Sequence, residues 1–585
     1  MKFVVNEMEK LLNTSFDGVE IKQGKNIKIS VKNGKKTVEY GDESCLSRAL
    51  AILKMKENDG DFEYSENPVF NMRCVMLDMS RNAVMKVCAV KKYLLYMAAM
   101  GLNTVMLYTE DTYELKEYPF LGYMRGRYTK NELKEIDDYA YSLGIEVVPC
   151  IQTLGHMEQY LRYTEADGMK DTQKVMLCGA DETYKFIETA VNFFKDTLRT
   201  DKIHIGMDEA DDVGCGKYFV KNGYRKRCDI IGEHLARVCE ICKNANLHPM
   251  MWSDMYCRMG SKIDFHYDTE SRLDEDIIEK IPDVDMVYWD YYHDDENFYR
   301  KIISNHRLMK KHIVFAGGIW TWDGLLPNVS YTKKTLIPAL CACRKEKIDS
   351  FIGTMWGDGG NETNHFLALF ALALYAEYSF AENPCEDTAY RLLETVSGIK
   401  KEAVEAMDSF NAHLDGTVRI GTQLVWGDIL LDNVSLDTKD FKFDAETFEK
   451  YKNNDEIFYP YIYELLCIAS VKRDIRARLK NAYDTGDKAY LKTLCEDILP
   501  KLRLRYERLF KIHEKQWRTT FKVFGWEVIG ARYLNTIGRI DYAKKEISRY
   551  LNGEIPKIEE LEGERLYQKR LARYYRNLAA TSEIF

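Results

Sequence analysis

The chain has 585 residues, of which 46% are hydrophobic and 30% charged, and its formal net charge is −9. This composition excludes a disordered chain and predicts a globular protein of several domains. The mildly acidic balance provides no basic stripe, so we expect no nucleic-acid partner. No uninterrupted apolar run of about 18 residues occurs, and the first residues lack an apolar signal core, so we expect a cytoplasmic protein without membrane contact.

The first 66 residues carry the pattern of short strands followed by a helix. Residues 19–21, 27–31 and 37–40 have β-type patterning, and residues 43–55 have helical spacing. This pattern predicts a small α/β domain over residues 1–66.

From Pro68 onward, short apolar runs alternate with amphipathic helices, which is typical of βα units around a parallel sheet. The expected strands cover residues 73–78, 104–108, 146–150, 203–207, 249–253, 286–290, 313–316 and 351–355. The expected helices cover residues 87–100, 131–143, 182–198, 229–245, 332–346 and 365–378. Because eight strands can close into a barrel, we predict a (β/α)8 TIM barrel over residues 67–385.

Beyond residue 386 the strand patterns fade, and long charged amphipathic segments take their place. These segments cover residues 464–480, 488–511 and 564–576. We therefore predict an all-helical domain over residues 386–585, with solvent-exposed charged faces. A homodimer formed through this domain is the expected assembly.

Acidic and aromatic side chains recur where the predicted barrel strands end. Because the carboxyl ends of all strands form one face of a barrel, we expect these side chains to converge. Aromatic rings suit the C–H faces of a sugar, and carboxylates suit its hydroxyls. The set comprises Asp78, Arg81, Glu110, Asp111, His156, Asp208, Glu209, Trp252, Asp254, Trp289, Asp290, Trp320, Trp322, Trp356 and Asp358.

The segment from His204 to Glu209 is the most informative of these strand ends. An apolar run leads directly into two adjacent carboxylates, Asp208 and Glu209. Two carboxylates this close in a cleft should not both ionise freely, so we expect one raised pKa and a general acid near neutral pH. The alternative interpretation is a solvated turn, because Asp-Glu pairs are common.

Several of these motifs resemble glycoside hydrolase family 20, the β-N-acetylhexosaminidases. The segment His204-Ile-Gly-Met-Asp-Glu209 resembles the family signature His-x-Gly-Gly-Asp-Glu, with Met207 in place of one glycine. Other resemblances cover the first strand, the second-strand acids, a Gly-His pair and two Trp motifs. These are residues 73–81, 108–111, 155–156, 252–254 and 356–358.

The resemblance implies an exo-acting, retaining β-N-acetylhexosaminidase that acts on an oligosaccharide or glycoconjugate. In this mechanism the 2-acetamido oxygen of the substrate attacks the anomeric carbon, Glu209 serves as acid and base, and Asp208 orients the acetamide. No metal or organic cofactor is implied. The implied substrate-binding residues are Arg73, Glu110, His156, Trp252, Trp289, Tyr291, Trp320, Trp356 and Asp358.

The sequence also departs from the family pattern. Gln152 and Leu154 replace the usual Asp and Pro, and residues 318–323 offer Trp where the strand-seven Tyr that holds the acetamide is expected. Tyr291 or Tyr292 could supply that hydroxyl. The chain is in this respect similar to intracellular bacterial hexosaminidases that accept both N-acetylglucosamine and N-acetylgalactosamine.

Two other classes of function stay open at this point. A noncatalytic glycan-binding or sensing protein would retain the aromatic site without turnover, and the departure at the acetamide site favours it. A metal-dependent hydrolase is the second rival, because five potential ligands fall near predicted strand ends, although no H-x-H or H-E-x-x-H spacing occurs. These ligands are His156, His248, Asp254, His266 and His293.

Overall fold

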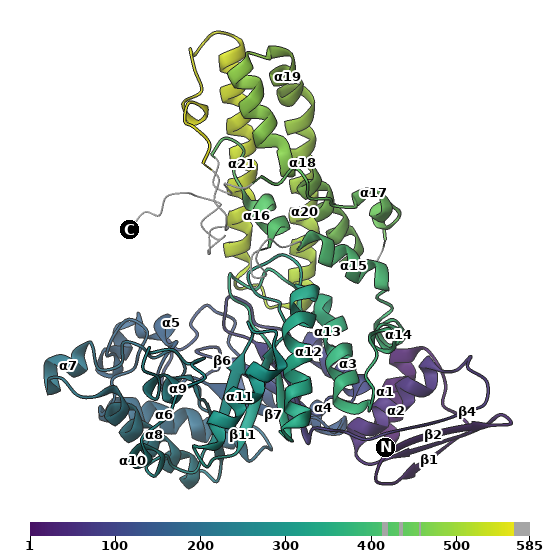
Figure 1. Ribbon diagram of the computed structural model, residues 1–585, viewed down its shortest axis with the longest axis vertical. Helices are drawn as coiled ribbons and strands as arrows, with labels where there is room; N and C mark the ends of the chain where they lie inside the picture. The colour runs from purple at the N-terminus through teal and green to yellow at the C-terminus, as the bar shows by residue number, and fades with distance from the viewer. Residues whose placement is uncertain (412–418, 432–436, 455–457, 567–585) are drawn as a thin grey trace.

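The computed structural model describes residues 1–411, 419–431, 437–454 and 458–566. Its N-terminal part is a four-stranded sheet in the order β1-β3-β2-β4, against which the helix α2 packs, and the helix α1 packs against α2 (Figure 1). The elements are α1 (Lys2–Leu12), β1 (Val19–Gln23), β2 (Ile27–Lys32), β3 (Lys35–Tyr40), α2 (Glu43–Met55) and β4 (Phe62–Glu66). The helix predicted over 43–55 and the three predicted strands are confirmed, whereas α1 and β4 were not predicted.

Eight parallel strands then form a closed barrel in the order β10-β11-β12-β5-β6-β7-β8-β9. The strands are β5 (Met72–Asp78), β6 (Thr104–Thr109), β7 (Glu146–Ile151), β8 (Lys202–His204), β9 (His248–Trp252), β10 (Asp285–Asp290), β11 (Ile313–Gly318) and β12 (Ser350–Met355). Every residue of β5, β6, β11 and β12 is buried, as expected for strands covered on both sides. The predicted TIM barrel is confirmed.

Helices surround the barrel close to the predicted positions. They are α3 (Val87–Met100), α4 (Lys130–Ser142), α6 (Asp181–Lys195), α8 (Arg227–Asn244), α12 (Val329–Lys345) and α13 (Leu369–Phe380). The helix α11 (Glu296–Arg307) also covers the barrel and was not predicted. Shorter helices lie in the loops, namely α5 (Glu158–Leu161), α7 (Lys217–Asn222), α9 (Asp254–Met259) and α10 (Glu275–Ile278).

The prediction for β8 was wrong at its end, because Gly206 and Met207 have φ of 71° and 74° and leave the β conformation.

The C-terminal region is helical in the residues that the structure describes, and it rises from one side of the barrel (Figure 1). Its helices are α14 (Glu386–Ser397), α15 (Lys401–Phe410), α16 (Ile420–Trp426), α17 (Ala445–Phe448), α18 (Phe458–Thr485), α19 (Lys488–Thr493), α20 (Leu499–Thr520) and α21 (Trp526–Leu551). The segment predicted over 564–576 lies outside the described residues from 567 onward. Among the described helices, none is long and apolar enough to cross a membrane.

Candidate active site

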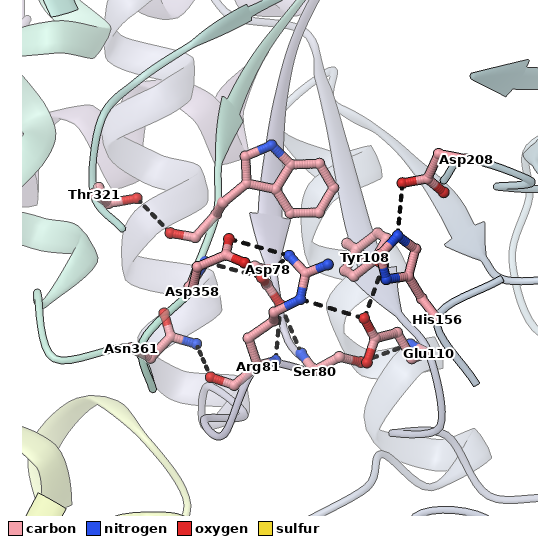
Figure 2. A network of polar contacts seen from close by, with 12 residues as sticks. Asp78, Ser80, Arg81, Tyr108, Glu110, His156, Asp208, Thr321, Asp358 and Asn361 are labelled. Carbon is pink, nitrogen blue, oxygen red and sulfur yellow. Dashed lines mark hydrogen bonds and ion pairs between the residues drawn. The ribbon is translucent and has the colours of Figure 1, made fainter. Parts of the chain in front are cut away.

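Side chains from five strand ends meet in one polar network at the carboxyl end of the barrel. Figure 2 shows Asp78 and Arg81 beyond β5, Glu110 beyond β6, His156 beyond β7, Asp208 beyond β8 and Asp358 beyond β12. These residues are up to 280 positions apart in the sequence, since 358 − 78 = 280. The convergence follows from the parallel barrel, in which all strands end at the same face.

Asp208 is held from two sides. The Gln152 side-chain amide donates to Asp208 Oδ1 at 2.8 Å, and His156 Nε2 lies 3.2 Å from Asp208 Oδ2. Burial alone would raise the pKa of Asp208, but the charge of His156 and the hydrogen bonds from His156 and Gln152 outweigh burial and lower that pKa to about 2. Asp208 is therefore an ionised, oriented carboxylate at neutral pH.

Glu209 has the opposite electrostatic environment, although it is the next residue. Burial and then the negative charge of Asp208 raise the pKa of Glu209, while 52% of its side chain stays exposed. Its backbone adopts φ 46°, a value that residues other than glycine rarely adopt. Its N–H donates to Asp254 Oδ2 at 3.0 Å. The local backbone thus turns the Glu209 carboxyl toward solvent beside an ionised Asp208.

His156 and Glu110 surround this pair with further charge. The Asp208 carboxylate raises the pKa of His156 to about 9 although burial opposes the change, so His156 is a cation at neutral pH. Burial raises the pKa of Glu110 to about 7, and the charges of Arg81 and His156 limit the rise. Tyr108 Oη donates to Glu110 Oε1 at 2.9 Å.

Arg81 is the centre of the remaining network (Figure 2). Its guanidinium lies 3.2 Å from Asp358 Oδ2 and 3.4 Å from Glu110 Oε1. It also stacks over the Trp356 ring, 4.9 Å from the ring centroid. An exposed Asp358 carboxylate and this arginine offer an acceptor and donors to a polar ligand.

The expectation that Arg73 binds the sugar is wrong. Arg73 lies near the amino end of β5, and its guanidinium donates to the carbonyl oxygens of Gly101 at 2.8 Å and Phe70 at 2.7 Å. A strand rises about 3.3 Å per residue, so five residues place Arg73 roughly 17 Å from the carboxyl end of β5. Counting residues along the predicted strand would have identified Arg81 instead.

Aromatic rings fill the space next to the polar network. Trp252 lies between His204 and Trp356, with centroid distances of 4.3 and 6.0 Å. Tyr291 stacks on Trp289 at 5.3 Å and lies 6.5 Å from Trp356. The structure therefore brings four of the expected aromatic residues into one cluster.

Two further expected residues have other surroundings. Trp320 is 2% exposed, and its indole N–H donates to the backbone oxygen of Tyr291 at 3.0 Å, so it supports Tyr291 from behind. His204 is fully buried against Trp252, and burial lowers its pKa to about 3, so it is a neutral side chain. Tyr292, by contrast, is exposed.

Neither Gln152 nor Asp254 was predicted to contact the acidic pair, since Asp254 was expected only as a strand-end acid or metal ligand and Gln152 only as a departure from the family pattern. Gln152 orients Asp208 and also accepts from the Met207 N–H at 3.2 Å. Asp254 accepts from Glu209 N and, at 3.3 Å, from Trp289 Nε1, while burial and then the charge of Asp208 raise its pKa to about 7. A signal for both exists in the sequence, because each lies directly beyond a predicted strand.

The potential metal ligands do not assemble. His248 lies at the amino end of β9, where its Nε2 is 2.9 Å from Asp285 Oδ1, far from the carboxyl-end network. His266 packs against the Trp289 ring in a tilted arrangement, and His293 Nδ1 lies 2.8 Å from Asp290 Oδ2. Among the residues that the structure describes, no three His, Cys, Asp or Glu side chains form a metal-binding group.

Family models match two parts of the chain. The catalytic domain of glycosyl hydrolase family 20 matches residues 70–271, and the C-terminal domain of glycoside hydrolase 20C matches residues 428–577. Hexosaminidase D of Bos taurus is 23% identical over 260 residues, covering 43% of this chain and 70% of that protein. Hexosaminidase D of Homo sapiens is 25% identical over 203 residues, covering 32% of this chain and 40% of that protein.

Solved structures share the fold. The chitobiase of Flavobacterium johnsoniae aligns over 99% of this chain and 93% of its own, with a TM-score of 0.52 and 16% identity. The exo β-N-acetylglucosaminidase of Vibrio harveyi, in complex with N-acetylglucosamine, aligns over 67% and 72%, with a TM-score of 0.51 and 16% identity. The closed barrel, its paired carboxylates and the catalytic-domain match define a glycoside hydrolase. The chain belongs to glycoside hydrolase family 20.

Proposed function

We propose that this enzyme is an exo-acting, retaining β-N-acetylhexosaminidase that removes terminal β-linked N-acetylglucosamine, N-acetylgalactosamine or both. One observation carries the proposal. Asp208 and Glu209 are adjacent, yet their environments move their pKa values in opposite directions, to about 2 for Asp208 and upward for Glu209. Carboxyl groups whose pKa values are driven apart in this way suit an acid and an oriented anion in one site.

In this proposal Glu209 protonates the leaving oxygen and then activates water. Its raised pKa keeps more of it protonated near neutral pH, and its half-exposed side chain can reach a ligand. Asp208 accepts a hydrogen bond from the acetamide N–H and stabilises the positive charge that develops when the acetamide oxygen attacks the anomeric carbon. Family 20 is an exception to the two-carboxylate scheme, so carboxyl separation does not define the stereochemistry.

Arg81 takes the sugar-hydroxyl role that the sequence resemblance gave to Arg73, and Asp358 shares it. Their mutual distance of 3.2 Å and their position beside Trp356 support this assignment. Trp252, Trp289 and Tyr291 then enclose the acetamide side, while Glu110 and His156 support the catalytic pair.

The remaining expectations belong to the same proposal. They are the division at residues 66 and 385, a cytoplasmic location, and a homodimer formed through the helical region. Light scattering that gives a monomer mass would contradict the homodimer.

The experiment is release of nitrophenol from the β-N-acetylglucosaminide and the β-N-acetylgalactosaminide. We expect Glu209→Gln to lower kcat by about 10²–10⁴-fold and Asp208→Asn by roughly 10²–10³-fold, with unchanged thermal unfolding. His248→Asn is the control, because His248 lies at the amino end of β9, where it pairs with Asp285 far from Asp208 and Glu209. Absence of wild-type turnover on both sugars would overturn the proposal and favour a glycan-binding protein.

A further inference from the structure

We propose that the helical region fixes the position of the sugar-binding loop, and that Arg532 of α21 is a positioning residue for substrate binding. This loop, called here the β12 loop, comprises residues 357–364, begins directly after Trp356 and carries Asp358. This inference rests on the proposed function, because it assigns Arg81, Trp356 and Asp358 to the sugar.

The turn between α20 and α21 is joined to the barrel through the backbone. Phe521 forms an antiparallel bridge with Met85, and the flanking hydrogen bonds run from Lys86 N to Thr520 O at 2.9 Å and from Lys522 N to Val84 O at 2.8 Å. The barrel partner is the segment that follows Arg81. In Figure 1 the lower ends of α20 and α21 accordingly reach the barrel.

Three helices of the helical region bind the β12 loop from one side. Arg532 of α21 forms an ion pair with Glu362 and donates to the Gly359 carbonyl oxygen at 2.7 Å. Trp426 of α16 donates from Nε1 to Glu362 Oε2 at 3.3 Å. At the end of α20, Thr520 Oγ1 accepts from Asn364 Nδ2 at 2.8 Å.

Residues 78–82, the segment that carries Arg81, hold the same loop from the other side. Gly357 N donates to Asp78 Oδ2 at 2.9 Å, and Asn361 Nδ2 donates to the Arg81 carbonyl oxygen at 3.1 Å. The side-chain amide of Asn82 donates both to Gly360 O at 3.1 Å and to Gly525 O at 2.9 Å, at the start of α21. A displacement of α21 would therefore reach the backbone around Arg81 and Asp358.

The conformation of the loop requires such support. Gly359, Gly360 and Asn361 adopt φ of 82°, 110° and 56° in succession. Glycine populates positive and negative φ about equally, so this backbone has few restraints of its own and keeps one conformation only where the surrounding structure holds it. The Glu362 carboxylate is fully buried, so removal of Arg532 would take an ion-pair partner away from a buried charge.

The loop geometry decides how well the sugar is held. If the loop relaxes, Asp358 and Trp356 move relative to Arg81, and the contacts to the substrate weaken. The position of Glu209 is unaffected, so the catalytic step stays the same. A misplacement near 1 Å can cost up to about 10²-fold in rate. We expect a smaller effect here, because Asp78 and Asn82 still hold the loop from the barrel side.

The test compares Arg532→Ala, Arg532→Lys and Arg539→Ala in the full chain on the nitrophenyl substrates. We expect Arg532→Ala to raise KM about tenfold with kcat within about twofold, which is a loss of substrate binding rather than of catalysis. Arg532→Lys should restore most of the affinity, because it keeps the charge beside Glu362. Arg539 lies on the same helix as Arg532 and pairs with Asp428, which follows α16, so Arg539→Ala controls for loss of an ion pair in α21 and should leave KM unchanged.

Hydrogen exchange of residues 357–364 provides a readout that needs no substrate. We expect faster exchange of this loop in Arg532→Ala and wild-type exchange in Arg539→Ala. If Arg532→Ala fails to fold, Asn82→Gly replaces it, because glycine tolerates the Asn82 φ of 86° while removing the bridge to Gly360 and Gly525.

The outcomes separate this inference from the proposed function. Absent wild-type turnover overturns the proposed function, whereas the exchange data still decide whether the helical region holds the loop. Unchanged KM in a folded Arg532→Ala enzyme, or wild-type exchange in the loop, would overturn the inference itself.

Discussion

The two ends of the barrel use the same residue types for different purposes. Near the amino end of β5, Arg73 is buried and donates to the backbone oxygens of Gly101 and Phe70. Beyond the carboxyl end of the same strand, Arg81 lies among the carboxylates of Glu110 and Asp358. An arginine bound to carbonyl oxygens stabilises the fold, whereas one beside an exposed carboxylate such as Asp358 can bind a ligand.

The histidines show the same difference. At the amino end, His312 lies 3.1 Å from Asp285 Oδ2 and 2.9 Å from Asp349 Oδ1. It thereby connects the start of β10 with the residue before β12. At the carboxyl end, His156 adopts φ 54° and faces the acidic pair Asp208 and Glu209. Strained backbone and opposed pKa shifts gather at the carboxyl end, which is where function is expected.

The largest expected effect comes from exchanging each arginine for alanine. Arg81→Ala should lower kcat/KM by roughly 10²–10³-fold, because charge-assisted hydrogen bonds to the sugar and to Asp358 disappear. Arg73→Ala should lower the free energy of unfolding by about 2–4 kcal/mol, because buried carbonyl oxygens lose their donors, with kcat/KM of the folded enzyme unchanged. Denaturant unfolding and steady-state kinetics of both variants test this difference between the two arginines. An equal loss of kcat/KM in Arg81→Ala and Arg73→Ala would contradict it.

His156→Asn should alter the pH dependence of activity. The protonated His156 holds the pKa of Asp208 at about 2, so its removal raises that pKa. The ionised Asp208 is the active form, and the acidic limb of kcat/KM should therefore move upward by about one to two pH units. Profiles from pH 3 to pH 8 measure the shift, with His248→Asn as a control at the amino end. An unmoved limb would show that Asp208 does not depend on His156.

The smallest effect is expected for His312→Gln. The hydrogen bond to Asp285 raises the pKa of folded His312 from 6.5 to about 9, although burial opposes the rise. A raised folded-state pKa means that this stabilisation is fully present below about pH 6.5 and is lost as the pH rises through about 9. Because 43% of the side chain is exposed, solvent screening limits it to about 0.5 kcal/mol.

Thermal unfolding of wild type and His312→Gln at pH 6 and pH 10 measures this contribution. The Tm difference between the two proteins should be present at pH 6 and absent at pH 10, while kcat/KM should be the same for both proteins at each pH. A Tm difference that is larger at pH 10 than at pH 6 would contradict a raised pKa of His312.

Much of the fold was predictable because each βα unit leaves a local pattern in the sequence. Alternating apolar runs and helices identified all eight strands, and residues 43–55 and 87–100 match α2 and α3 at both ends. The end of β8 was mispredicted, because the apolar Ile205 and Met207 continue the strand pattern while the backbone has already left it at Gly206.

The sequence by itself determined the barrel, its order along the chain, and the position of Asp208 and Glu209 beyond a strand, because these depend on residues close in sequence. Residue counting along the predicted strand already places Arg73 at the amino end, but only the tertiary structure brings Arg81 between the carboxylates of Glu110 and Asp358. It also decided that Gln152 and His156 separate the two carboxyl pKa values, and that Arg532 reaches Glu362 from another region. The physical reason is that such contacts join residues many positions apart, and no local pattern records which distant partner shares a buried charge.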